Sequence, residues 1–208
     1  MDIELVSKII LIVLFCLFSI IRIGYYRTAK KAGYRTVIIE SRWYSIWLSI
    51  FICYEVFTFF TYILFPDLLA WAAMPLPLAL RITGACLGIM ALLWFIWIHR
   101  SLGSNLSVRL QIKDSQRLVT NGPYRWIRHP MYTAFYLLHL ATFLLTANWF
   151  IGLSWTAGLT SIIALRIKRE EAMMINYFGE RYRLYMQQTG RFLPIIRWRP
   201  SAKNRAVT

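Results

Sequence analysis

Residues 131–165 read MYTAFYLLHLATFLLTANWFIGLSWTAGLTSIIAL, a stretch without a single Asp, Glu, Lys or Arg. A helix of roughly 20 apolar residues crosses a bilayer, and about 17 are the practical minimum. The stretch is long enough for two such helices, and the short segment Thr146-Ala-Asn148 interrupts it near the middle. We therefore predict a helical hairpin, with spans at residues 131–147 and 149–165.

Three further apolar stretches precede this hairpin, at residues 3–23, 44–65 and 78–98. The prolines at 66, 75 and 77 separate the last two. The first stretch does not resemble a cleavable signal peptide, because its apolar run is long and no small-residue cleavage site follows it. The sequence thus predicts an all-α integral membrane protein with about five transmembrane helices, forming one domain over residues 1–208.

The composition supports this class. Hydrophobic residues make up 58% of the chain and charged residues only 16%, whereas an ordinary soluble domain carries about 25% charged residues. A disordered chain and an ordinary soluble domain are both excluded.

The basic residues are distributed unevenly along the chain. Of its 24 Lys and Arg residues, 22 fall within residues 22–42, 100–128 and 166–205, which alternating crossings place on one side of the membrane. Basic loops remain in the cytoplasm, so we expect the N-terminus outside and the C-terminus inside. The net charge of +15 is then explained by topology and by membrane lipids with anionic headgroups, and nucleic acid is not an expected partner.

A few polar or reactive residues lie within the predicted spans. Glu55 is either a functional acid or a glutamate that is hydrogen-bonded to a neighbouring helix, and His139 is interpreted as an interhelical hydrogen-bonding residue. The three cysteines (Cys16, Cys53, Cys86) lack CxxC spacing and are interpreted as small core residues. No metal site is predicted.

The loop between the third and fourth spans carries turn and helix-start signals. Asn121-Gly-Pro123 predicts a turn. His129 precedes a proline, which disfavours helical dihedral angles, and Pro130 suits the first turn of a helix. We therefore expect backbone N–H groups around His129, at the start of the fourth span, to face a polar or anionic ligand.

The segment after the fifth span continues as an amphipathic helix, with Gly179 as a kink. Arg166 and Glu170 are four residues apart and share one helix face. By pattern alone this is an interfacial helix with a solvated ion pair. The sequence carries no GxGxxG after a strand, no P-loop and no HExxH, so these two segments by themselves indicate only a polar pocket at a membrane face.

Together the two segments resemble the isoprenylcysteine carboxyl methyltransferase family of integral membrane methyltransferases. The first match reads RLVTNGPY at 117–124 and RHPMY at 128–132. The second comprises Arg166 with the Glu-Glu pair at 170–171, followed by FGERY at 178–182 and TGRFLP at 189–194. The resemblance covers about residues 101–194, and the three N-terminal spans match only in hydropathy.

The resemblance implies an S-adenosylmethionine-dependent methyltransferase, with the cofactor bound between the loop before the fourth span and the helix after the fifth. Arg166 matches the arginine thought to hold the substrate carboxylate. The remaining matched positions are implied cofactor contacts: Gln111, Gln116, Arg117, Leu118, Val119, Tyr124, His129, Pro130, Met131, Tyr132 and Glu170.

The implied acceptor is a lipophilic small molecule or a lipidated substrate, methylated on a carboxylate at the membrane. The short N-terminal region resembles the compact prokaryotic members, which points to a prokaryotic cytoplasmic membrane and to acceptors other than prenylated proteins. The alternatives are N-methylation of a phospholipid or amine, S-methylation of a thiol, a sterol-reductase-like NADPH-dependent reductase and a non-catalytic lipid-binding protein.

Overall fold

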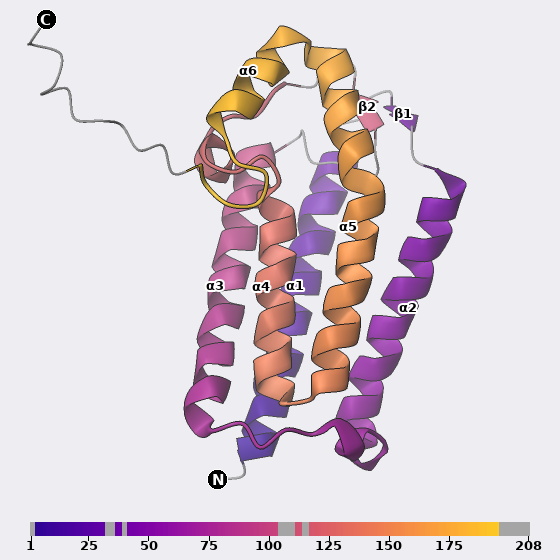
Figure 1. Cartoon of the computed structure of the whole chain (residues 1–208), viewed down its shortest axis with the longest axis vertical. Helices are drawn as coiled ribbons and strands as arrows, with labels where there is room; N and C mark the ends of the chain where they lie inside the picture. The colour runs from indigo at the N-terminus through magenta and orange to yellow at the C-terminus, as the bar shows by residue number, and fades with distance from the viewer. Residues whose placement is uncertain (1–2, 32–35, 39–40, 104–110, 114–116, 196–208) are drawn as a thin grey trace, which may run out of the picture.

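A computed structural model describes residues 3–31, 36–38, 41–103, 111–113 and 117–195. The described residues form five long helices and a shorter sixth. In Figure 1 the long helices run roughly antiparallel to one another, and the sixth lies across one end of them. The helices are α1 (Ile3–Lys31), α2 (Arg42–Leu64), α3 (Leu78–Leu102), α4 (Pro130–Thr146), α5 (Trp149–Phe178) and α6 (Glu180–Gln188). Helix α4 packs against α1, α3 and α5, while α2 packs against α5.

Shorter elements connect these helices. A 3-10 helix, η1 (Pro66–Ala72), follows α2, and another, η3 (Gly122–Arg125), precedes α4. Strands β1 (Thr36–Ile38) and β2 (Gln111–Lys113) pair antiparallel, with Val37 opposite Ile112. The all-α prediction is confirmed, and this small sheet is an addition that hydropathy did not indicate.

Each predicted span coincides with one of the five long helices of the described residues, although the spans at 44–65 and 131–147 extend one residue beyond the ends of α2 and α4. Four of them, α1, α2, α3 and α5, are long and apolar enough to cross a membrane, and α4 is a shorter apolar helix of 17 residues. The fifth predicted span and the amphipathic segment as far as Phe178 form one continuous helix of 30 residues, α5. It ends at Gly179, whose φ of 58° separates α5 from α6, so the predicted kink is a break.

The predicted hairpin turn is confirmed between α4 and α5. Ala147 adopts a left-handed conformation with a φ of 46°. The Asn148 side chain caps α5 by accepting the N–H of Ile151 at 3.1 Å, and it donates to the carbonyl of Leu69 at 2.9 Å. Asn148 therefore fixes the hairpin turn against η1.

Two glycines on α3 permit close contacts with neighbouring helices. A Cβ on Gly84 would lie 2.8 Å from the Cβ of Leu144, and one on Gly88 would lie 2.4 Å from a methyl group of Leu14. The first contact brings α3 onto α4 and the second brings it onto α1. Small residues serve this purpose in membrane proteins, where helices associate through close packing.

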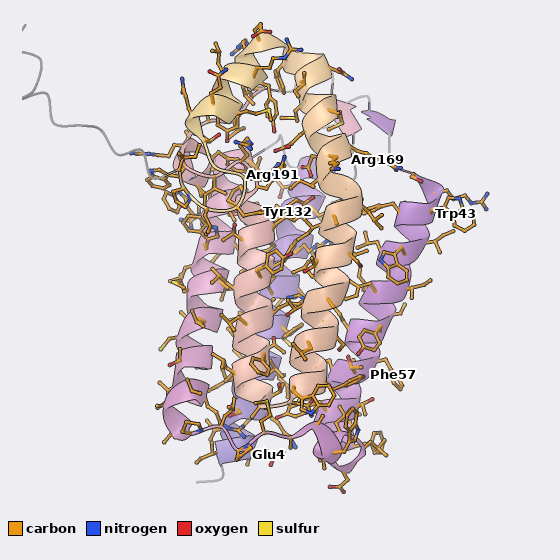
Figure 2. All side chains as sticks on the ribbon, in the orientation of Figure 1. Glu4, Trp43, Phe57, Tyr132, Arg169 and Arg191 are labelled. Carbon is orange, nitrogen blue, oxygen red and sulfur yellow. The ribbon has the colours of Figure 1, made fainter. Side chains whose placement is uncertain are left out.

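The interpretation of the cysteines as core residues is wrong. Cys16, Cys53 and Cys86 are all exposed on the outer surface of the bundle. Trp43 and Phe57 likewise project from α2, with 80% and 70% of their surface exposed (Figure 2). Lipid is as apolar as a protein core, so apolar residues in a membrane helix need not be buried within the protein.

The positions of the helix ends agree with the prediction that the three basic segments lie on one side of the membrane. The C-terminal ends of α1, α3 and α5 lie at the end of the molecule that carries β1, β2 and α6, and η1 and the N-terminus lie at the other end (Figure 1). The described parts of the three segments rich in Lys and Arg thus extend to the same end of the molecule.

Candidate active site

A cavity of about 270 Å³ opens between the helices near the basic end. Its volume is close to the lower limit of about 300 Å³ that is usual for ligand pockets. Nine of the twelve residues singled out in the sequence line it: Arg117, Leu118, Val119, Tyr124, His129, Met131, Tyr132, Arg166 and Glu170.

The other three predicted residues do not contribute described side chains to this cavity. Pro130 is buried at the first position of α4, between His129 and Met131. The backbone of Gln111 lies in β2, and its side chain is outside the described residues, as is Gln116.

Glu170 is at the centre of the polar part of the cavity. The hydroxyl of Tyr132 donates to its Oε2 at 2.7 Å, and the Nδ1 of His129 lies 3.9 Å from the same oxygen. The Glu170 side chain is 28% exposed. Glu170 is therefore held in place by α4 and still accessible from the cavity.

Arg166 lies one turn before Glu170 on α5. Its Nε is 3.7 Å from Oε2 of Glu170, and its Nη1 donates to the hydroxyl of Tyr44 on α2 at 3.3 Å. Only 13% of the Arg166 side chain is exposed. The two residues do share a helix face, as predicted, but that face lines the cavity and the pair is not solvated.

A second acidic centre, Glu171, lies beside the cavity and was not assigned a role from the sequence. Its Oε1 accepts from Arg128 Nε at 3.2 Å, from His129 Nε2 at 3.3 Å and from Arg191 Nε at 3.2 Å. Its Oε2 accepts from Arg191 Nη2 at 2.5 Å. One carboxylate thus joins α5, the loop before α4 and the segment after α6 at the end of the molecule where Figure 2 labels Arg191.

Residues 189–192, which we call the strap, run beside the loop at 126–129. The N–H of Arg128 donates to the carbonyl of Gly190 at 2.8 Å, and the N–H of His129 donates to the carbonyl of Arg191 at 3.1 Å. The expectation that these N–H groups face a ligand is therefore wrong, because the strap already uses them. The side chain of Arg128 adds bonds to the carbonyls of Met186 and Thr189.

The strap tolerates only glycine at position 190. A Cβ there would lie 1.6 Å from the carbonyl oxygen of Leu193, which is backbone and cannot rotate away. We expect Gly190→Ala to open the strap and to lower stability by about 1–3 kcal/mol, as overpacking does. Limited proteolysis after Arg191 and the melting temperature in detergent would measure this. Gly24→Ala, where a Cβ meets nothing within 4 Å, is the control, and equal behaviour of the two variants would contradict the prediction.

Three buried or partly buried phenols complete the polar end of the cavity. Burial raises the pKa of Tyr185 to about 12 and raises the pKa values of Tyr124 and Tyr182 above their usual range. All three are therefore neutral at physiological pH. The Tyr185 hydroxyl donates to the carbonyl of Tyr124 at 2.6 Å, which fixes η3 against α6.

The deeper part of the cavity is mostly apolar but ends in a polar pair. His139 Nε2 lies 2.9 Å from Glu55 Oε1 on α2, which confirms the interhelical hydrogen bond expected of this histidine. Sequence reasoning did not assign Arg22, Tyr44, Glu55, His99 or Arg128 to the site, although all five line the cavity. Arg128 stands within the quoted motif, whereas the other four come from helices without a recognisable motif.

Comparison with known proteins finds a family whose model matches part of this chain. The model of the isoprenylcysteine carboxyl methyltransferase family matches residues 79–176, from α3 through the loop and α4 to the end of α5. The matched segment is slightly less than half of the chain. The matched segment contains most of the cavity lining, including Arg166 and Glu170.

Relatives and a solved structure agree with this assignment. The protein-S-isoprenylcysteine O-methyltransferases of Xenopus laevis and Homo sapiens are 34% and 32% identical over 97 residues, which is 46% of this chain and 34% of theirs. A structure of the eukaryotic intramembrane Ras methyltransferase matches with a TM-score of 0.53 at 28% identity, covering 77% of this chain and 55% of that one. The chain thus aligns with about a third of the length of these relatives and shares a multi-pass membrane fold.

Proposed function

We propose that this protein is an S-adenosylmethionine-dependent methyltransferase that acts at the membrane on a lipophilic acceptor bearing a carboxylate. The observation that carries the proposal is that one cavity collects nine residues predicted from two separate motifs. The match of residues 79–176 to the model of the isoprenylcysteine carboxyl methyltransferase family supports the proposal, as do the names of the relatives. The whole chain, residues 1–208, then acts as one membrane domain, with the cofactor region at about 101–194.

The residues at the polar end of the cavity fit S-adenosylmethionine. Glu170 offers a carboxylate with exposed surface to the cationic groups of this cofactor. Tyr124 and Met131 offer apolar and aromatic surface, and Arg117, Leu118 and Val119, which have no regular secondary structure, line the same cavity. When bound, the cofactor supplies an electrophilic methyl group on a sulfonium sulfur.

Arg166 is the residue that would hold the acceptor. Its guanidinium presents a planar set of donors that matches a carboxylate, and Tyr44 and Glu170 orient it from two sides. A carboxylate is already ionised at pH 7, so the reaction needs no general base. The protein's contribution is to hold the nucleophilic oxygen within about 3–3.5 Å of the methyl carbon.

The apolar part of the cavity would hold the acceptor's tail. It lies between α2 and α5, which are long enough to cross a membrane, and the shorter apolar helix α4. Its lining residues are Leu48, Phe51, Ile52, Phe135, Leu159, Ile162 and Ile163. A tail placed there would leave the carboxylate beside Arg166 at the polar end.

Substitutions in the loop before α4 test the cofactor assignment. His129→Ala and Tyr124→Ala should each weaken binding of S-adenosylhomocysteine at least tenfold, because each removes a side chain that lines the polar end. Calorimetry on the purified protein measures this affinity without requiring an acceptor. Arg125→Ala, whose side chain lies over the ring of Trp126 and does not line the cavity, is the control. Unchanged affinity in both site variants would reject the assignment.

We propose that the basic end faces the cytoplasm of a prokaryotic cell. In a variant whose three cysteines are replaced by alanine, a cysteine at Asp67 in η1 should react with a membrane-impermeant maleimide in sealed cells. A cysteine at Glu180 in α6 should react only after lysis. Both positions are exposed. Labelling of the Glu180 position in intact cells would reverse the orientation.

A further inference from the structure

A polar pair lies deep in the apolar part of the cavity, away from the site proposed for methyl transfer. His139 on α4 contacts Glu55 Oε1 through Nε2 at 2.9 Å and the carbonyl of Phe135 through Nδ1 at 2.9 Å. A carbonyl only accepts, so Nδ1 carries a hydrogen. A second proton lies between His139 Nε2 and Glu55 Oε1. The hydrogen bond to His139 therefore uses only one of the two oxygens of the Glu55 carboxyl group.

The pair lies in a largely buried, apolar region, where ionisable side chains carry a high desolvation penalty. The side chain of His139 is 8% exposed and that of Glu55 is 20% exposed. Helix α2, which carries Glu55, has the length and hydropathy of a membrane-spanning helix. Ionisable residues at such depth mark functional sites more often than structural ones. Trp155, which is buried and lies 5.9 Å from the His139 ring, packs against the same histidine.

The depth of the pair can be estimated along α4. Tyr132, which contacts Glu170, lies seven residues before His139. At 1.5 Å per residue the two positions are about 10 Å apart along the helix axis. An acceptor held at Arg166 would therefore cross an apolar section of the cavity before its tail reached Glu55.

The charges around Glu55 restrict what would bind there. Arg22 on α1 lines the same cavity, with its guanidinium 5.8 Å from the centroid of the Phe135 ring. The guanidinium of Arg22 and the proton shared with His139 already supply positive charge to this cavity. A neutral hydrogen-bond donor suits this position better than a second cation.

We propose that Glu55 and His139 form a subsite for a hydroxyl group on the tail of the acceptor. This inference rests on the proposed function for the position of the acceptor's carboxylate. A hydroxyl would donate to the oxygen of Glu55 that does not contact His139. An entirely apolar tail would instead cover that oxygen without a partner, which carries a desolvation penalty. The acceptor is therefore polar at both ends.

The test uses the whole protein in lipid nanodiscs with labelled S-adenosylmethionine. The probes are lipophilic carboxylic acids of graded length, each made with a methyl, a hydroxyl or an ammonium group at the far end. We expect kcat/KM at the best length to be at least tenfold higher for the hydroxyl-ended acid than for either of the others. Equal values for the hydroxyl-ended and methyl-ended acids would overturn the subsite.

The double variant Glu55→Leu/His139→Leu removes both partners, so it leaves neither one unpaired. We expect it to bind S-adenosylhomocysteine normally and to prefer the methyl-ended acid. Glu180→Gln, at an exposed position outside the cavity, should keep the original preference. A double variant that retained the preference for hydroxyl would exclude this pair.

A binding measurement separates the subsite from methyl transfer. If no acid is methylated, the proposed function fails, and the melting temperature of the protein with each probe still tests the subsite. Stabilisation by the hydroxyl-ended probe in the unmodified protein but not in the double variant supports the subsite. Equal stabilisation of both proteins overturns it.

Discussion

Arg166→Lys is expected to lower kcat/KM for a lipophilic carboxylate at least tenfold while leaving the affinity for S-adenosylhomocysteine nearly unchanged. Each tenfold loss corresponds to about 1.4 kcal/mol of transition-state stabilisation. Lysine keeps the positive charge but loses the planar fork, so it cannot bind both oxygens of a carboxylate in one orientation. Tyr44, which now accepts a hydrogen bond from Arg166, would no longer orient the cation. Steady-state kinetics and calorimetry on the same preparation give both quantities.

Arg169→Lys is the matched control for this experiment. Arg169 lies on α5 less than one turn from Arg166, but it is exposed and does not line the cavity (Figure 2). Its substitution should leave both kinetic and binding parameters unchanged. If Arg166→Lys is equally harmless, the acceptor is not a carboxylate, and N-methylation or S-methylation becomes the better proposal.

The five long helices of the described residues were predictable because each one contains a local apolar run. The breaks at Pro66, Pro77 and Asn148 are also local signals, and the structure places helix boundaries within a few residues of them. The side on which each helix packs was not predictable by the same means. The cysteines show why, because a membrane helix is apolar on its lipid face as well as on its protein face.

The residues of the candidate site were predictable only where they belong to a recognisable sequence motif. Residues 117–132 and 166–170 carry the recognisable pattern, and their side chains do meet at one cavity. Arg22, Tyr44 and Glu55 join that cavity from α1 and α2, and only tertiary packing reveals them. The strap was quoted as a motif, yet its hydrogen bonds to Arg128 and His129 depend on a pairing between segments about 60 residues apart.

Glu171 carries the largest expected effect on stability. Its side chain is 7% exposed and that of Arg128 is 9% exposed, so the pair is buried. Removing one partner of a buried ion pair costs about 3–5 kcal/mol, because the other charge is left without compensation. We expect Glu171→Gln to lower the melting temperature in detergent markedly and to make the strap sensitive to proteases. Cofactor affinity should fall as well, because Glu171 fixes the ring of His129.

Two matched variants distinguish this role from a general need for acidic residues on α5. Glu170→Gln, at the adjacent but more exposed position, should weaken cofactor binding with a much smaller loss of stability. Arg191→Ala should cost far less than Arg128→Ala, although both side chains contact Glu171, because Arg191 is 45% exposed and water can replace its contact. If the two glutamate variants melt at the same temperature, Glu171 is not the centre that holds the strap. The packing of Gly190 and the backbone bonds to Arg128 and His129 would then have to hold it without the ion pairs.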